Sequence, residues 1–155
     1  MTPATKLAQR FALAVPALLL AGAYLSQYGF GLYPCEMCMW QRYGHFAALA
    51  LALTSTFAPR PRLWIALAAI GIMGSGLVGG FHAGVEYGWW EGITSCAIPA
   101  SSGSNALEAI LNAPIVRCDV APWSLLGISL AGFNALFSVG AALAISSLLR
   151  EKVAV

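Results

Sequence analysis

Long apolar runs separated by short polar segments constrain this chain more than any other feature of its sequence. Residues 11–30, 63–85 and 123–149 contain no Asp, Glu, Lys or Arg, and residues 41–57 contain only Arg42. A membrane-spanning helix needs about 20 mostly apolar residues. Charged residues are 9% of the chain, whereas soluble domains carry about 25%. The sequence therefore predicts an all-α membrane protein, a single domain over residues 1–155 that forms a four-transmembrane-helix bundle in a lipid bilayer.

The positive charges predict how the chain lies across the membrane. Six of them fall on one side of a four-span arrangement and only Arg42 and Arg117 on the other; the six are Lys6, Arg10, Arg60, Arg62, Arg150 and Lys152. Loops rich in Lys and Arg stay in the cytoplasm, so both termini are expected there. The net charge of +2 is too small to indicate a nucleic-acid partner.

The N-terminal segment also permits a second interpretation. Lys6 and Arg10 followed by an apolar run and Ala21-Gly22-Ala23 resemble a signal peptide with its cleavage site. The run continues apolar through Leu25 and Phe30, which favours a full span. In both interpretations the four cysteines lie outside the cytoplasm.

Four cysteines lie in the two outer loops, over residues 31–40 and 86–122. Cys35 and Cys38 form a Cys-x-x-Cys pair, and Cys96 and Cys118 form a wide pair. Thiols on this side meet a compartment that permits disulfides, and two disulfides there can exchange through thiolates. A redox relay is the main interpretation. Structural disulfides, a zinc or iron–sulfur site, and a transporter with incidental cysteines remain as alternatives.

Local patterns predict two packing features. Asn105-Ala-Leu-Glu108 reads as a capping box, which opens a short amphipathic helix that ends by Pro114 and lies on the membrane interface in the second outer loop. Gly76, Gly80 and Gly84 share one helical face, a spacing that lets helices approach closely in lipid.

Ionisable residues near the cysteines are candidates for a site, because such groups are costly inside a membrane. Arg42 follows Cys38 by one helical turn and could stabilise a thiolate or the oxyanion of a reduced quinone. An arginine that extends to the headgroups is the alternative. His45 and His82 are equally compatible with proton transfer and with burial in the bundle, so their roles stay open.

Specific motifs connect this pattern with a known family. The segment Pro34-Cys35-Glu36-Met37-Cys38-Met39-Trp40-Gln41-Arg42-Tyr43 resembles the signature of the disulfide-bond formation protein B family, DsbB. Cys118-Asp119, Pro122-Trp123 and the stretch from Leu126 to Asn134 resemble that family's last outer loop and fourth helix.

The resemblance implies a quinone-dependent protein thiol–disulfide oxidoreductase of the bacterial inner membrane, with its cysteine loops in the periplasm. It would reoxidise a DsbA-like thiol oxidase and pass electrons to ubiquinone or menaquinone, without a metal. By the family pattern, the partner attacks Cys96 of a Cys96–Cys118 disulfide, Cys118 then attacks Cys35, and Cys38 becomes a thiolate that faces the quinone. The resemblance implies that Arg42 and His82 contact the quinone.

Overall fold

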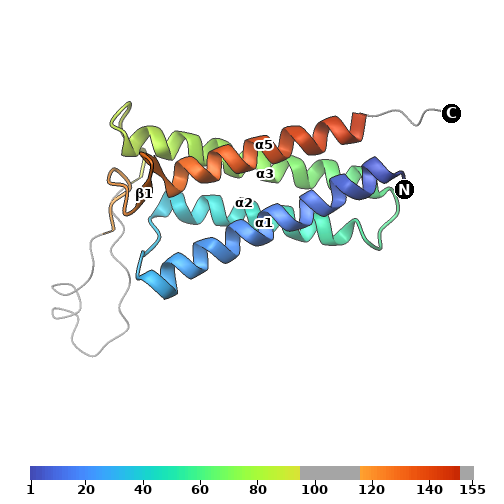
Figure 1. Cartoon of the computed structure of the whole chain (residues 1–155), viewed down its shortest axis with the longest axis horizontal. Helices are drawn as coiled ribbons and strands as arrows, with labels where there is room; N and C mark the ends of the chain where they lie inside the picture. The colour runs from blue at the N-terminus through green and yellow to red at the C-terminus, as the bar shows by residue number, and fades with distance from the viewer. Residues whose placement is uncertain (95–115, 151–155) are drawn as a thin grey trace.

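Four α-helices make up the architecture of the computed structural model, which describes residues 1–94 and 116–150 (Figure 1). Two short strands precede the last helix. In chain order the elements are α1 (Pro3–Phe30), α2 (Glu36–Thr54), α3 (Pro61–Glu86), β1 (Ser124–Leu125), β2 (Ile128–Ser129) and α5 (Leu130–Arg150). The predicted four-helix bundle is thus confirmed in its helix count. The predicted interfacial helix, between Asn105 and Pro114, lies outside the described residues.

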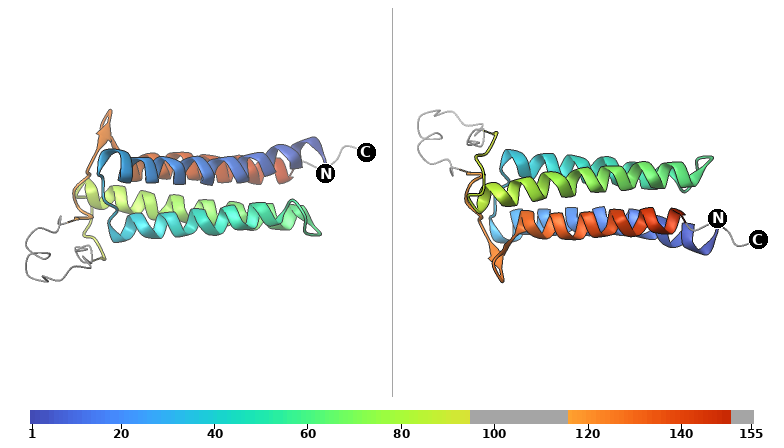
Figure 2. Two further views of the ribbon diagram at one scale, coloured as in Figure 1. Left: turned by 90° about the horizontal axis from the view of Figure 1, so that it is seen from below. Right: turned by 90° about the horizontal axis from the view of Figure 1, so that it is seen from above.

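The helices run nearly parallel to one long axis, and each packs against the next in a ring. The close neighbours are α1 with α2, α2 with α3, α3 with α5, and α5 with α1, and Figure 2 shows α1 beside α5 and α2 beside α3. The start of α1 and the end of α5 lie at the same end of the bundle (Figure 1). We call this the terminal end, and the opposite end, which carries Cys35, the cysteine end.

The helix boundaries follow from ordinary capping chemistry. The hydroxyl of Thr2 accepts a hydrogen bond from the Thr5 amide at the start of α1, and Gly31 ends that helix with a left-handed backbone at φ 69°. Pro61 occupies the first turn of α3, where a missing N–H costs nothing. The cap of α2 is unusual, because Cys35 supplies it with its sulfur, which accepts a hydrogen bond from the Cys38 amide at 3.3 Å.

Three of the four described helices are long and apolar enough to cross a membrane, namely α1, α3 and α5. Helix α2 is shorter, with 19 residues, and its first half contains Gln41, Arg42 and His45. These polar side chains are buried, so they face the other helices rather than lipid. The low hydropathy of α2 therefore reflects the polar side chains that it directs toward the other helices.

The structure differs from the sequence prediction at the start of the last span. Residues 123–149 were predicted as one span, but α5 begins at Leu130. The two strands before it form a β-hairpin with a two-residue turn. Leu126 and Gly127 in the turn have φ of 53° and 79°, as a type I′ turn requires. The Tyr87 hydroxyl donates to the Gly127 carbonyl and accepts from the Ser129 amide, which fixes the hairpin to the end of α3.

The core is divided along the length of the bundle. At the terminal end, all four helices meet through small side chains, which form an alanine cluster of Ala8, Ala12, Ala48, Ala52, Ala68, Ala69, Ala141 and Ala142 with Ile65, Ile72 and Ile145. The cysteine end instead holds a smaller cluster of Cys35, Met37, Val85 and Cys118.

Of the three α3 glycines that were predicted to allow close approach, Gly76 does so against α5 and Gly80 does not, while Gly79, which was not predicted, also does. A Cβ built at Gly76 or Gly79 would lie 2.9 Å from atoms of α5, whereas one at Gly80 would lie 3.8 Å from its nearest neighbour and one at Gly84 would meet the ring of Trp90. The tight α3–α5 contact therefore uses Gly76 and Gly79. The equal spacing of the predicted set concealed this difference.

Candidate functional site

Three cysteines meet at the cysteine end of the bundle. The sulfurs of Cys35 and Cys38 are 3.1 Å apart, longer than the roughly 2.0 Å of a disulfide, so the two residues are hydrogen-bonded thiols. Cys118 is buried in the same cluster as Cys35, and its sulfur accepts a hydrogen bond from the Thr94 hydroxyl at 3.3 Å. The fold thus brings one member of the wide pair to the tight pair. Cys96 lies outside the described residues.

The surroundings of Cys35 and Cys118 favour the neutral form of these two thiols. The pKa of Cys35 is raised to about 12 by the hydrogen bond shared with Cys38 and by burial, while a hydrogen bond with His82 acts in the opposite direction. Burial also raises the pKa of the Cys118 thiol. Beyond the cluster, the neighbouring Arg117 lowers the pKa of the exposed Asp119 carboxyl. The cysteine cluster is therefore a desolvated site, in which a sulfur anion needs a hydrogen-bond donor or a cation nearby.

His82 connects the cysteines with a buried carboxyl group. Its Nε2 is 3.5 Å from the Cys35 sulfur and 3.7 Å from Oε1 of Glu86, and both side chains are only 2% exposed. The other Glu86 oxygen, Oε2, has no hydrogen-bond partner among the described residues. A thiol, an imidazole and a carboxyl group therefore lie within reach of one another below the protein surface.

A chain of side-chain amides extends from His82 into the bundle. Gln41 Nε2 contacts the Met37 carbonyl and His82 Nδ1, each at 3.1 Å, and Gln41 Oε1 accepts from Asn134 Nδ2 at 2.8 Å. Asn134 Nδ2 also donates to the Ser75 carbonyl at 3.1 Å. This chain joins α2, α3 and α5 by hydrogen bonds.

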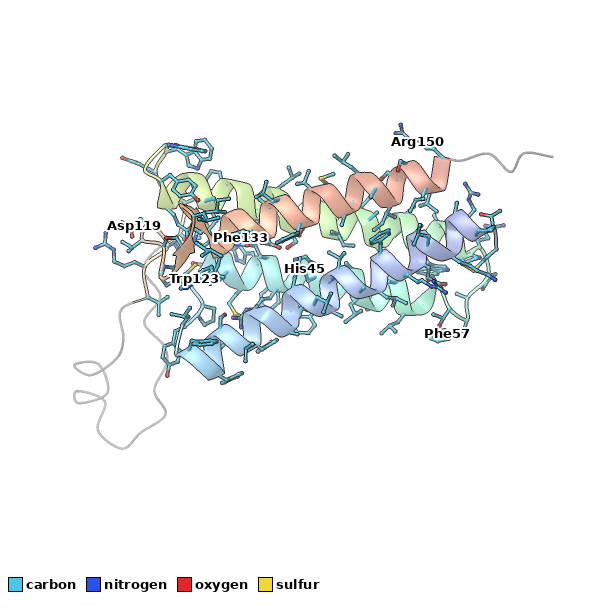
Figure 3. All side chains as sticks on the ribbon, in the orientation of Figure 1. His45, Phe57, Asp119, Trp123, Phe133 and Arg150 are labelled. Atoms are coloured by element: carbon cyan, nitrogen blue, oxygen red, sulfur yellow. The ribbon has the colours of Figure 1, made fainter. Side chains whose placement is uncertain are left out.

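The same chain reaches the second histidine, which lies deep in the bundle (Figure 3). His45 Nε2 donates to Asn134 Oδ1 at 2.8 Å, and the Ser138 hydroxyl donates to the same oxygen at 2.9 Å. His45 Nδ1 is buried without a partner among the described residues. His45 is thus a buried bundle histidine, although it also lines the cavity described below.

Arg42 is a buried cation, with 6% of its surface exposed. Its guanidinium donates to Gln27 Oε1 at 2.5 Å and to the Ala23 carbonyl at 3.0 Å, and it lies 4.8 Å from the centre of the Tyr24 ring. Within residues 1–94 and 116–150 no carboxylate pairs with it. Arg42 therefore holds a positive charge inside the bundle.

A cavity of about 250 Å³ connects these groups. Cys38, Arg42 and His45 line it from one face of α2, and His82 and Glu86 line it from α3. Its other walls are mostly apolar and come from α1 and α5, including Leu18, Leu19, Leu20, Phe133 and Phe137. An apolar pocket with a few polar groups at one end suits a small lipid-soluble molecule. A buried arginine that pairs with no carboxylate in the described part of the chain suits a ligand whose oxygens carry or develop negative charge.

A metal is a second ligand to consider, because Cys35, Cys38 and His82 offer three ligand atoms within 4.8 Å of one another. A histidine that binds zinc through one ring nitrogen usually donates a hydrogen bond from the other. Here Nε2 faces the sulfur, and Nδ1 faces the nitrogen of Gln41, which is itself a donor. The second ring nitrogen thus lacks the acceptor that a zinc ligand needs, and the arrangement opposes metal binding.

The sequence pattern had singled out most of these residues but not their connections. No role was predicted for Gln41, Asn134 or Glu86, although each is a polar group within or next to an apolar span. Amides inside a membrane are costly unless they are paired, and that signal could have identified Gln41 and Asn134. The pairing of His82 with Cys35 links positions far apart in the chain, so no local pattern contains it.

A protein family and two relatives each match most of this chain. Residues 5–148 match the model of the family described as Disulfide bond formation protein DsbB. A Disulfide bond formation protein B from Verminephrobacter eiseniae (strain EF01-2) is 31% identical over 138 residues, covering 80% of this chain and 73% of the relative. Uncharacterized protein RP370 from Rickettsia prowazekii (strain Madrid E) is 24% identical over 131 residues, covering 81% and 76%. No solved structure shows a significant match.

Proposed function

Because the chain belongs to the DsbB family of disulfide bond formation proteins, we propose that it reoxidises a periplasmic DsbA-like thiol oxidase and delivers the electrons to a membrane quinone. The observation that carries this proposal is the position of Cys118. It is buried against Cys35, while Cys38 lines the cavity beside Arg42. The Cys35 sulfur therefore adjoins Cys118 of the second outer loop, and the Cys38 sulfur adjoins the cavity.

The proposed relay begins in the second outer loop. A thiolate of the reduced partner attacks the Cys96 sulfur of a Cys96–Cys118 disulfide, which forms a mixed disulfide and releases Cys118 as a thiolate. Cys118 then attacks Cys35 of a Cys35–Cys38 disulfide, so that a Cys35–Cys118 bond forms and Cys38 leaves as a thiolate. Each exchange forms one S–S bond and breaks one. Burial of Cys118 beside Cys35 supports the second exchange because the attacking sulfur needs no long movement.

The remaining exchanges return the loops to their starting state. The second thiolate of the partner attacks its own mixed disulfide, which releases the oxidised partner and a Cys96 thiolate. Cys96 then attacks Cys118, the Cys96–Cys118 bond re-forms, and Cys35 leaves as a thiolate. Cys35 and Cys38 now hold the two electrons that came from the partner. Regeneration of the Cys35–Cys38 disulfide would then require an acceptor of two electrons and two protons, which a quinone held in the cavity would supply.

The cavity residues fit a quinone, whether ubiquinone or menaquinone. A bound quinone would supply a two-electron acceptor whose oxygens become negative before they are protonated. Arg42 would hold it by charge and hydrogen bonding, and His82 is the proposed second polar contact. The apolar walls from α1 and α5 would enclose its ring and exclude water from the Cys38 sulfur. By the same proposal the protein lies in the bacterial inner membrane, with the cysteine end periplasmic and both termini cytoplasmic.

Covalent trapping tests the relay. In cells that carry Cys118→Ala, Cys96 is a free thiol that attacks the disulfide of the oxidised partner, which forms a mixed disulfide and releases the partner's other sulfur as a thiolate. No Cys118 thiol is present to displace the partner from Cys96, so a covalent complex with the partner should accumulate. The complex would be detected on non-reducing gels and its partner identified by mass spectrometry, with Cys96→Ala as the control that should abolish it. A complex that persists in Cys96→Ala, or a DsbA-like protein absent from the Cys118→Ala complex, would contradict the proposal.

A further inference from the structure

We propose that Gln41 is a positioning residue that fixes the proton of His82 on Nε2, so that the imidazole presents an N–H to the sulfur of Cys35. The use of this N–H in the relay rests on the proposed function, but the position of the proton does not. The side-chain amides of Gln41 and Asn134 each have an orientation that the surrounding backbone determines.

Two backbone carbonyls fix the orientation of the amides. Gln41 Nε2 lies 3.1 Å from the Met37 carbonyl oxygen, and Asn134 Nδ2 lies 3.1 Å from the Ser75 carbonyl oxygen. A carbonyl only accepts hydrogen bonds, so each of these contacts requires an NH₂ group. Turning either amide over would place its oxygen against a carbonyl oxygen. The contact between Asn134 Nδ2 and Gln41 Oε1 at 2.8 Å agrees with this orientation at both residues.

This orientation decides which nitrogen of His82 carries the proton. The NH₂ group of Gln41 has two hydrogens, and one is used by the Met37 carbonyl. The other points to His82 Nδ1 at 3.1 Å, so Nδ1 must be an acceptor and cannot hold a proton. In a neutral imidazole the other nitrogen is then the donor. The N–H of His82 therefore lies on Nε2, 3.5 Å from the Cys35 sulfur and 3.7 Å from Glu86 Oε1.

A donor at this place matters when Cys35 becomes an anion. In the last exchange of the proposed relay, Cys96 bonds to Cys118 and the electron pair of the broken Cys35–Cys118 bond remains on Cys35. His82 Nε2–H can donate to that sulfur at once, with no proton transfer. The amide of Cys38 already donates to the same sulfur at 3.3 Å. Together they offer two hydrogen bonds to a leaving thiolate that is otherwise desolvated.

The chain permits a direct measurement, because His45 and His82 are its only histidines. We would label the protein with ¹⁵N-histidine and read the protonation of each ring nitrogen by NMR at neutral pH, with His45→Phe to assign the two residues. The expected result is a protonated Nε2 and an unprotonated Nδ1 at His82. Among the described residues, the titratable groups around this ring are Glu86, Cys35, Cys38 and Cys118. A proton on His82 Nδ1 in the wild-type protein would overturn the proposal.

Gln41→Glu is the critical variant, because a carboxylate accepts hydrogen bonds and should draw a proton onto His82 Nδ1. The matched control is Ser138→Ala, which removes a different hydrogen bond to the same network, at Asn134 Oδ1, and should leave His82 unchanged. Both substitutions change the size of the side chain little, and circular dichroism of each variant would show whether it is folded. An unprotonated Nδ1 in Gln41→Glu would show that Gln41 does not control the proton.

A second readout connects the proton with the sulfur. In a reduced Cys38→Ala background, the rate of Cys35 alkylation by iodoacetamide reports how readily its thiolate forms. If Gln41→Glu leaves His82 singly protonated, on Nδ1, this rate should fall by about tenfold or more, because a hydrogen bond to an anion is lost. If His82 becomes doubly protonated, the rate should rise instead. An unchanged rate despite a moved proton would refute the role of His82 at Cys35.

Discussion

Replacement of Asn134 by leucine should show how much the buried amide chain contributes to stability. Asn134 makes four short side-chain hydrogen bonds, with His45, Gln41, Ser75 and Ser138, at 2.8, 2.8, 3.1 and 2.9 Å. Leucine has a similar shape but can make none of them. The change therefore tests hydrogen bonding with little change in packing volume.

The expected magnitude depends on which reference applies. Four buried groups left unpaired in a soluble protein would cost about 1–3 kcal/mol each. Hydrogen bonds between membrane helices are worth about 0.6 kcal/mol on average, because the unfolded chain in lipid finds other partners. Asn134 lies within α5, so the membrane value applies, and four bonds give about 2.4 kcal/mol. Ser138→Ala removes one bond and should cost about a quarter of that amount.

The measurement is reversible unfolding in mixed detergent micelles, followed by circular dichroism. Ser147→Ala is the control, because the Ser147 hydroxyl only donates to the Ala144 carbonyl on an exposed helix surface. The order of destabilisation should be Asn134→Leu, then Ser138→Ala, then Ser147→Ala. If Asn134→Leu destabilises the protein no more than Ser138→Ala does, the amide chain is not a stabilising network.

Three further predictions concern packing, charge and thiol reactivity. Gly76→Ala should destabilise the bundle by about 1–3 kcal/mol, because the new Cβ would lie 2.9 Å from a side chain of α5. Gly80→Ala should not destabilise it, because the nearest atom would lie 3.8 Å from the new Cβ. Equal unfolding free energies for the two variants would contradict this prediction. Arg42→Met should lower the rate of reduction of a soluble quinone analogue by up to about 10²-fold and spare covalent complex formation with the partner; unchanged quinone kinetics would show that the buried charge has no role. The pKa values of Cys35 and Cys118 are raised in the folded protein, so the folded state is stabilised when these two thiols are protonated. This stabilisation is complete below the ordinary thiol pKa of 9.0 and is lost as the pH rises, for Cys35 as the pH approaches its folded-state pKa of about 12. Alkylation of both in the reduced protein should therefore need a higher pH than in the unfolded chain, as peptide mass spectrometry would show, and equal pH profiles would refute the assignment.

The sequence predicted the helices because their signal is local. An apolar run long enough to span a membrane is visible in any window, and α1, α3 and α5 follow from it. The hairpin before α5 was not predicted, since residues 123–129 are as apolar as the span they precede. Its turn depends on the backbone of Leu126 and on two hydrogen bonds with the Tyr87 hydroxyl, one donated and one accepted. Both are products of the tertiary structure.

The candidate site was predicted as a set of residues rather than as an arrangement. Cysteine spacing and the family motif indicated Cys35, Cys38 and Cys118. Arg42 was indicated by the family motif and by the cost of placing a charge inside a membrane. The direction of each hydrogen bond was out of reach, because it depends on which carbonyl faces which amide. The path from Asn134 through Gln41 to His82 exists only once three helices have packed together.

The alanine cluster at the terminal end has a consequence for motion. Alanine has no side-chain rotamers to lose on burial, so helices joined through it can pack closely at little entropic cost, and amide hydrogens there should exchange with solvent only when the whole protein unfolds. The cysteine end has no such alanine cluster among the described residues but holds the cavity, whose walls come from all four helices and are mostly apolar on α1 and α5. Fluctuations that part α1 from α5 should therefore be confined to that end. A molecule dissolved in the lipid could then enter between α1 and α5 at the cysteine end, while the two helices stay packed together at the terminal end.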